Sequence, residues 1–146
     1  MSRTIVVGNG PNLNLQGVRE PEIYGRETLA DIEAMLQSRA RERGAELAFF
    51  QTNHEGELID RLQRESQSAA GIVLNPGAFT HYSYALYDCL KALTVPVIEV
   101  HLSNLFRRPE GFPRSSVTAP AARGVISGLG PRGYLFALEY LLDLDQ

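Results

Sequence analysis

Two pairs of side chains in this sequence are spaced so that each pair can share one chemical step. Arg19 and Tyr24 lie five residues apart in a polar stretch that also contains glycine and proline. A nearby guanidinium favours the ionised phenolate over the phenol, so this pair suggests a basic tyrosine. A surface loop whose tyrosine merely covers the core is equally consistent with these residues alone.

The second pair is Glu99 and His101, which lie two apart in an apolar run typical of a strand. Side chains two apart on a strand project to the same face. The carboxylate can then fix the orientation and tautomer of the imidazole, as a general acid or base requires. The alternative is a surface ion pair at a strand end. We favour the functional interpretation because this strand is expected at or near the centre of a sheet.

Short apolar runs alternate with amphipathic stretches and predict the elements that position these pairs. We expect strands at residues 5–7, 47–50, 71–74, 95–100 and 123–127. We expect helices between a capping box at Thr28 and a terminal Gly44, after a polar turn at 53–57, and at 79–93 and 134–142.

This alternation predicts an α/β fold with a parallel sheet covered on both faces. Five strands fit the flavodoxin-like order 2-1-3-4-5, a three-layer sandwich that binds ligands beyond the carboxyl ends of strands one and three. The polar residues that follow the predicted strands fall there: Asn12, Asn75, His81, His101 and Ser103.

Length and composition limit the class of protein. The 146 residues fit one domain, residues 1–146, and a net charge of −3 disfavours nucleic acid and anionic membranes as partners. Cys89 is the single cysteine, so a reducing cytoplasm is the expected setting. No apolar run approaches the roughly 18 residues of a membrane span, and strand-like sequence near the start argues against a signal peptide.

Other polar residues allow more than one interpretation. His81 and Asp88 are seven apart, which predicts one face of the helix at 79–93, although Asp88 could equally meet a neighbouring subunit. Asn53 is expected to cap the helix that follows it. His54, His81 and His101 follow three successive strands, so a zinc-dependent hydratase is a distant alternative. A flavodoxin-like binding module without catalysis is another.

Five blocks of sequence together resemble one family, type II 3-dehydroquinate dehydratase. They are GPNLNL at 10–15, REPEIYG at 19–25, NHEGELI at 53–59, NPGA and TH within 75–81, and PVIEVHLSN at 96–104. The resemblance implies a flavodoxin-like fold that uses neither metal nor organic cofactor. It also implies a homododecamer, assembled as a tetramer of trimers.

The resemblance further implies the dehydration of 3-dehydroquinate to 3-dehydroshikimate by anti elimination through an enolate. Tyr24, assisted by Arg19, would remove the C2 proton. Asn12 would stabilise the enolate through an ordered water. His101, oriented by Glu99, would protonate the departing C1 hydroxyl.

Substrate-binding residues carry over in the same way. The backbone N–H groups of Leu102 and Ser103 would hold the substrate carboxylate, and Asn75 would lie near the C1 hydroxyl. His81 would bind a ring hydroxyl, with Asp88 reaching across from an adjacent subunit. Residues 16–26 would close over the substrate as a lid.

One loop, residues 104–116, departs from the family pattern. The family usually carries a substrate-binding arginine directly after a phenylalanine, whereas here Pro113 follows Phe112. We expect Arg114, one residue along, to supply the missing cation, because the other arginines of the loop lie nearer its start. The alternative is that Arg114 faces solvent and another part of the loop closes the site.

Overall fold

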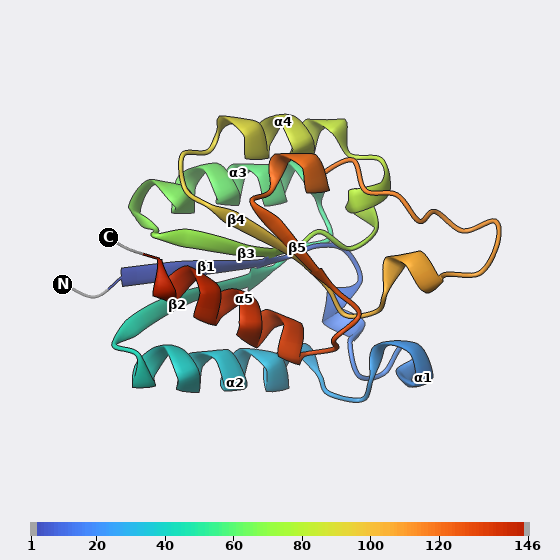
Figure 1. The fold of residues 1–146 in the computed structure, drawn as a ribbon, viewed down its shortest axis with the longest axis horizontal. Coiled ribbons are helices and arrows are strands. Elements are labelled where there is room, and N and C mark those ends of the chain that lie inside the picture. The colour runs from blue at the N-terminus through green and yellow to red at the C-terminus, as the bar shows by residue number, and fades with distance from the viewer. Residues whose placement is uncertain (1–2, 145–146) are drawn as a thin grey trace.

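Five parallel strands form one sheet in the computed structural model, which describes residues 3–144 (Figure 1). The strands are β1 Arg3–Asn9, β2 Ala45–Gln51, β3 Gly71–Asn75, β4 Val97–His101 and β5 Gly124–Ser127. Their spatial order is β2-β1-β3-β4-β5, which confirms the predicted flavodoxin-like topology. The helices are α1 Pro21–Tyr24, α2 Leu29–Glu42, α3 Glu55–Glu65, α4 Tyr84–Ala92 and α5 Arg132–Asp143.

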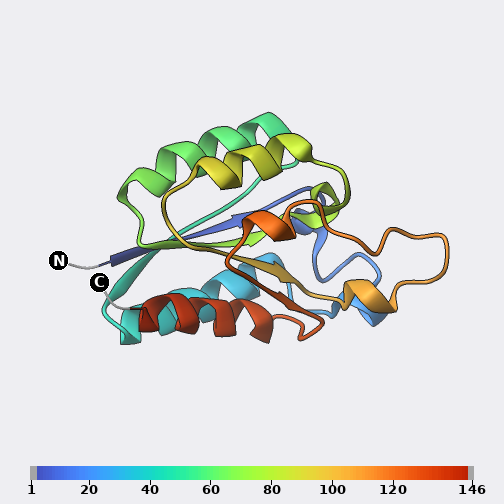
Figure 2. The ribbon, with the colours of Figure 1, turned by 45° about the horizontal axis from the view of Figure 1, so that its top comes forward.

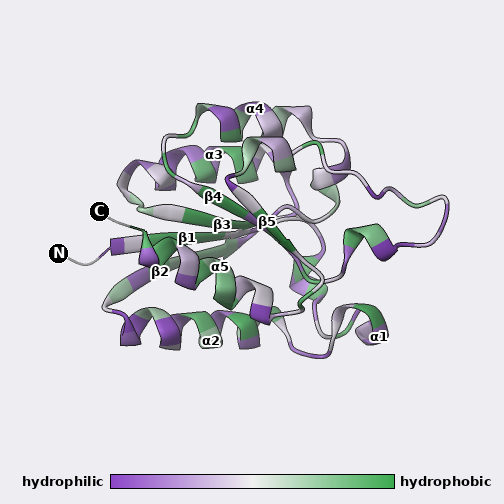
Figure 3. Cartoon of the chain, viewed as in Figure 1, coloured by the Kyte–Doolittle hydropathy of each residue, from purple (hydrophilic) through white to green (hydrophobic). Residues whose placement is uncertain are grey.

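Two apolar layers hold the helices against the sheet. Helices α3 and α4 cover one face, and α2 and α5 cover the other (Figure 2). Successive residues of β1 point to opposite faces, so Val6 packs in one core cluster while Ile5 and Val7 pack in the other. The apolar residues gather on the strands, and the hydrophilic ones lie mostly on the outer helical faces (Figure 3). No helix within residues 3–144 is long and apolar enough to cross a bilayer.

Helix α2 begins and ends beside the two residues predicted from the sequence, Thr28 and Gly44. The Thr28 side chain accepts a hydrogen bond from the Asp31 N–H at 3.1 Å, and the Asp31 carboxylate accepts from the Thr28 N–H at 3.0 Å. This reciprocal pair is the predicted capping box. Gly44 follows the helix with a φ of 69°, a left-handed conformation that favours glycine.

The prediction of one continuous helix over residues 79–93 was wrong. A short 3₁₀ turn, Gly77–His81, comes first, and Tyr82 then leaves the helical region with a φ of −150°. The Ser83 hydroxyl accepts from the Leu86 N–H at 3.0 Å and so caps α4, which begins at Tyr84. His81 and Asp88 therefore do not share one helix face.

Candidate active site

A pocket lies beyond the carboxyl ends of β1, β3 and β4, where the α1 segment and the long loop after β4 extend from the sheet (Figure 1). Its lining brings together seven of the residues singled out from sequence: Asn12, Arg19, Tyr24, Asn75, His101, Leu102 and Ser103. The lining also includes Gln16, the first residue of the predicted lid, and Arg108, which was not singled out as a site residue. Glu99, His81, Asp88 and Arg114 lie outside this lining.

His101 lines the pocket and forms a buried pair with Glu99, and we call these two residues and Asn75 the floor of the site. His101 Nε2 lies 2.6 Å from Glu99 Oε2, which confirms that the two side chains share one face of β4. Glu99 is fully buried and His101 is 5% exposed. The bond occupies Nε2 of the imidazole and leaves Nδ1 as the ring nitrogen for a ligand.

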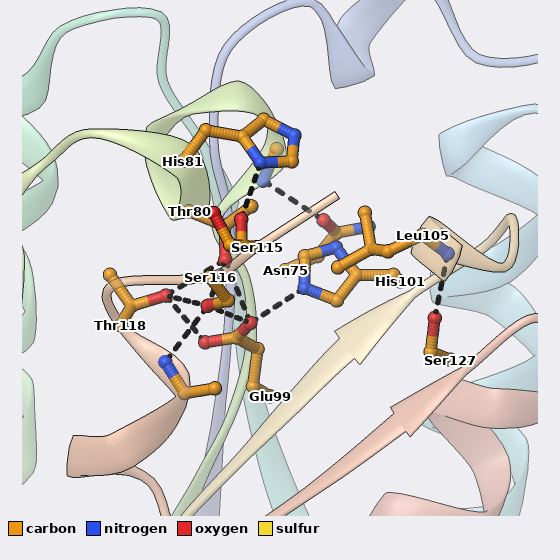
Figure 4. A network of polar contacts seen from close by, with 12 residues as sticks. Asn75, Thr80, His81, Glu99, His101, Leu105, Ser115, Ser116, Thr118 and Ser127 are labelled. Atoms are coloured by element: carbon orange, nitrogen blue, oxygen red, sulfur yellow. Dashed lines mark hydrogen bonds and ion pairs between the residues drawn. The ribbon is translucent and has the colours of Figure 1, made fainter. Parts of the chain in front are cut away.

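Three hydroxyl groups complete the surroundings of Glu99 (Figure 4). Thr80 and Ser116 donate to Oε2 at 2.8 and 3.1 Å, and Thr118 donates to Oε1 at 2.6 Å. Burial by itself raises the pKa of Glu99, but the hydrogen bonds from His101, Thr118 and Thr80 outweigh it and hold that pKa below its ordinary value. An ionised Glu99 accepts the N–H on His101 Nε2, which fixes the orientation of the ring.

Asn12 is held at the pocket rim by its backbone. It has a left-handed φ of 68°, a conformation that asparagine adopts more readily than most residues. Its N–H donates to Asn53 Oδ1 at 2.9 Å, and Gln51 Nε2 donates to the same oxygen at 3.0 Å. The prediction that Asn53 caps α3 was wrong, because His54 is the N-cap residue and Asn53 instead supports Asn12.

Arg19 and Tyr24 meet in the segment that covers the pocket. The guanidinium carbon of Arg19 lies 4.9 Å from the centroid of the Tyr24 ring. Tyr24 belongs to the one-turn helix α1, and its carbonyl accepts from Gln16 Nε2 at 2.6 Å. Gln16 is buried, so it ties α1 to the body of the protein. Nothing in the local sequence indicated this bond, which spans eight residues.

Two residues of the pocket lining carry peptide N–H groups without protein partners among the described residues. Leu102 and Ser103 line the pocket directly after β4. Within residues 3–144 neither donates to another protein group, although the Leu102 carbonyl accepts from the Gly130 N–H at 3.0 Å. Unpaired N–H groups at a pocket wall are suited to an anionic oxygen.

The loop of residues 104–116 places Arg108, rather than Arg114, in the pocket lining. His81 Nδ1 donates to the Ser115 carbonyl at 2.7 Å (Figure 4). Arg108 Nη1 lies 3.5 Å from Nε2 of the same imidazole. Arg114 Nε donates to the carbonyl of Arg108 at 2.9 Å. Arg114 thus contacts the backbone of the loop in this chain.

The remaining candidates are not gathered in the pocket. Asp88 is exposed on α4 and lies outside the lining of the pocket. The zinc alternative requires several ligating side chains to converge. Within residues 3–144 no group of three or more histidine, cysteine, aspartate or glutamate side chains could hold a metal ion.

Comparisons with known proteins agree with the resemblance found in the sequence. A family model described as dehydroquinase class II matches residues 3–142. A 3-dehydroquinate dehydratase of Roseiflexus castenholzii is 58% identical over 138 residues, which cover 94% of this chain and 87% of the relative. One of Thermus thermophilus is 54% identical over 140 residues, which cover 95% of this chain and 93% of the relative.

Solved structures are similar over the same length. The crystal structure of type II dehydroquinase from Propionibacterium acnes matches with a TM-score of 0.92 and 41% identity, covering 97% of each chain. That from Butyrivibrio crossotus matches with a TM-score of 0.92 and 43% identity, covering 96% of this chain and 97% of the other. The chain therefore belongs to the class II dehydroquinase family.

Proposed function

We propose that this protein is a 3-dehydroquinate dehydratase, a hydro-lyase that forms 3-dehydroshikimate through an enolate. The observation that carries the proposal is one pocket with a tyrosine–arginine pair in its cover and a buried histidine–carboxylate pair in its floor. The substrate has a C2 proton acidified only by the C3 ketone and a poor leaving group at C1. A base and a separate acid meet these two requirements.

The reaction proceeds in two steps. Tyr24, as phenolate beside the Arg19 guanidinium, takes the C2 proton, and the electrons of the C–H bond pass into the C3 carbonyl to give the enolate. Asn12, through an ordered water, stabilises the oxyanion. The enolate then re-forms the ketone and the C1–C2 double bond as the C1–O bond breaks. The imidazolium form of His101, held by ionised Glu99, donates its Nδ1 proton to the hydroxyl, which leaves as water, and the ring becomes neutral with its remaining proton on Nε2. The proton on Tyr24 passes to solvent, and a solvent proton restores the imidazolium.

The substrate carboxylate is assigned to the unpaired N–H groups of Leu102 and Ser103. Asn75 contacts the region of the C1 hydroxyl, and His81 binds a ring hydroxyl. Asp88 reaches the site from an adjacent subunit, which its exposed position on α4 allows. This shared site accords with the proposed homododecamer, a tetramer of trimers in the cytoplasm.

In this chain, two arginines of the 104–116 loop take the place of the single substrate-binding arginine that the family usually carries there. Arg108 lines the pocket and approaches His81, so its guanidinium is placed to meet ring hydroxyls beside that imidazole. Arg114, which we first expected to bind substrate, holds the Arg108 carbonyl and can act through it. Direct binding by Arg114 remains a prediction that requires the loop to rearrange.

Ultraviolet detection of the conjugated enone formed from 3-dehydroquinate tests the proposal. The purified chain should raise the absorbance at the same rate with and without a metal chelator. Activity that the chelator abolishes would favour the zinc-dependent hydratase. No enone under either condition, from protein shown to be folded by circular dichroism, would refute the proposal.

A further inference from the structure

We infer that Tyr134, a residue of α5 outside the pocket lining, is a positioning residue that fixes the Asn75 amide for the substrate. The Tyr134 hydroxyl donates to Asn9 Oδ1 at 2.7 Å and accepts from Asn75 Nδ2 at 2.8 Å. Asn9 and Asn75 are register partners at the ends of β1 and β3. The hydroxyl thus joins the two strands at the point where the order of the sheet reverses.

Backbone groups at both ends give this chain of hydrogen bonds one direction. The Phe50 carbonyl can only accept, so Asn9 turns Nδ2 towards it at 3.0 Å and presents Oδ1 to Tyr134. The Gly77 N–H can only donate, so Asn75 turns Oδ1 towards it at 3.0 Å and presents Nδ2 to Tyr134. The single hydroxyl proton then has one acceptor, and the orientation of both amides is determined.

The surroundings keep the hydroxyl in its neutral form. Tyr134 is fully buried, with 0% of its surface accessible, and so is Asn9. Burial raises the pKa of Tyr134 well above its ordinary value, although the hydrogen bond from Asn75 opposes the shift. A buried hydroxyl and two buried amides satisfy one another here, and loss of any member leaves a polar group unpaired.

The chain of hydrogen bonds from Asn9 through Tyr134 to Asn75 determines which Asn75 group can bind a ligand. Asn75 Nδ2 carries two hydrogens, and within residues 3–144 Tyr134 is its acceptor for one of them. Asn75 lines the pocket together with His101, and the two side chains lie close to each other in Figure 4. The second N–H is therefore a donor for a substrate oxygen. This assignment rests on the proposed function: the oxygen is that of the C1 hydroxyl, which Asn75 would orient for protonation by His101.

Tyr134→Phe keeps the buried ring and removes only the hydroxyl. We expect kcat/KM to fall by roughly tenfold with a rise in KM, which corresponds to about 1.4 kcal/mol. Tyr140→Phe is the matched control on the same helix: this side chain is 42% exposed, and its kinetics should not change. A purely structural role would instead lower the amount of folded enzyme, and so kcat, at unaltered KM.

A double-mutant cycle with Asn75→Ala separates positioning from general destabilisation. If Tyr134 acts through Asn75, adding Tyr134→Phe to Asn75→Ala should change kcat/KM by less than about twofold. The same factor in both backgrounds, or wild-type KM in Tyr134→Phe, would overturn the inference. Should Tyr134→Phe not fold, Asn9→Ala removes the acceptor of the hydroxyl and should give the same rise in KM; an unaltered KM there would contradict the inference.

The proposed function and this inference fail in different ways. A folded wild-type chain that forms no enone contradicts the proposed function. An active wild-type chain whose kinetics are indifferent to the Tyr134 hydroxyl contradicts only the inference.

Discussion

The floor and the cover of the pocket are built in different ways. The floor consists of Asn75, Glu99 and His101 at the ends of central strands, and each is at most 5% exposed. The cover consists of residues 16–26 and 104–116. There the Arg19 side chain is 47% exposed and pairs at 3.8 Å with Glu20, whose side chain is 51% exposed.

This difference assigns different physical requirements to the two steps of the proposed reaction. The acid and its carboxylate are held by buried hydrogen bonds before any ligand arrives, so they need no reorganisation during catalysis. The proposed base belongs to a segment of mostly exposed residues, which under the proposed function closes over the substrate. Changes in the floor should therefore alter chemistry and stability together. Changes in the cover should alter turnover or binding while the fold survives.

The largest expected effect is in the cover. Tyr24→Phe should lower kcat by at least about a hundredfold, because it removes a positioned proton acceptor. The melting temperature should stay near that of the wild type. Tyr82→Phe, at a side chain that is 57% exposed and outside the pocket lining, is the matched control. Near-normal turnover in Tyr24→Phe would remove tyrosine from the base role.

The next effect is in the floor. Glu99→Gln keeps the shape of the side chain but removes the charge that stabilises the imidazolium of His101. We expect kcat to fall roughly 10- to 100-fold, the range known for losing a carboxylate that orients a metal-bound histidine, because Glu99 holds the His101 ring through the same kind of hydrogen bond. Glu46→Gln, on the exposed side of β2, should leave steady-state kinetics unchanged. A Glu99→Gln enzyme with full activity would show that the pair is structural only.

Smaller effects should separate the arginines of the 104–116 loop. Arg108→Ala should raise KM about tenfold, as expected for one charge-assisted hydrogen bond to substrate. Arg114→Ala should raise it about two- to threefold, because it loses only one bond to the Arg108 carbonyl. Arg107→Ala is the control. A larger rise in KM for Arg114→Ala than for Arg108→Ala would restore Arg114 as the direct ligand.

The smallest expected effect is on acid stability. The pKa of Glu99 is lowered in the folded protein, so its ionisation adds to the free energy of unfolding above the unfolded-state pKa of about 4.3. That contribution is lost as the pH falls through the folded-state value. The free energy of unfolding of wild type minus that of Glu99→Gln should therefore decrease from about pH 6 to about pH 3. Urea titrations at both pH values measure it, and a constant difference would contradict the assignment.

Much of the floor was predictable from sequence because its geometry is local or follows from strand order. The two-residue period of a strand brings Glu99 and His101 together, and the capping box at Thr28 needs only residues of one turn. The parallel order of the strands then places Asn12 and Asn75 at one edge of the sheet.

The cover and its supports were less predictable because they depend on contacts between distant segments. Asn53 has the composition of a helix cap, yet it accepts from the Asn12 N–H, 41 positions away in sequence. The choice between Arg108 and Arg114 depends on the path of a long loop, for which no periodicity exists. The break before α4 had a readable signal in Ser83, a good capping residue, but the apolar pattern around it outweighed that signal.

Exchange of the C2 hydrogen of 3-dehydroquinate with deuterated water tests most directly the division between a base in the cover and an acid in the floor. His101→Ala should still exchange this hydrogen, because Tyr24 can form the enolate and return a solvent-derived deuteron, while enone formation is lost. Tyr24→Phe should lose both exchange and enone formation. Exchange that survives in Tyr24→Phe, or that disappears in folded His101→Ala as completely as in Tyr24→Phe, would contradict the division.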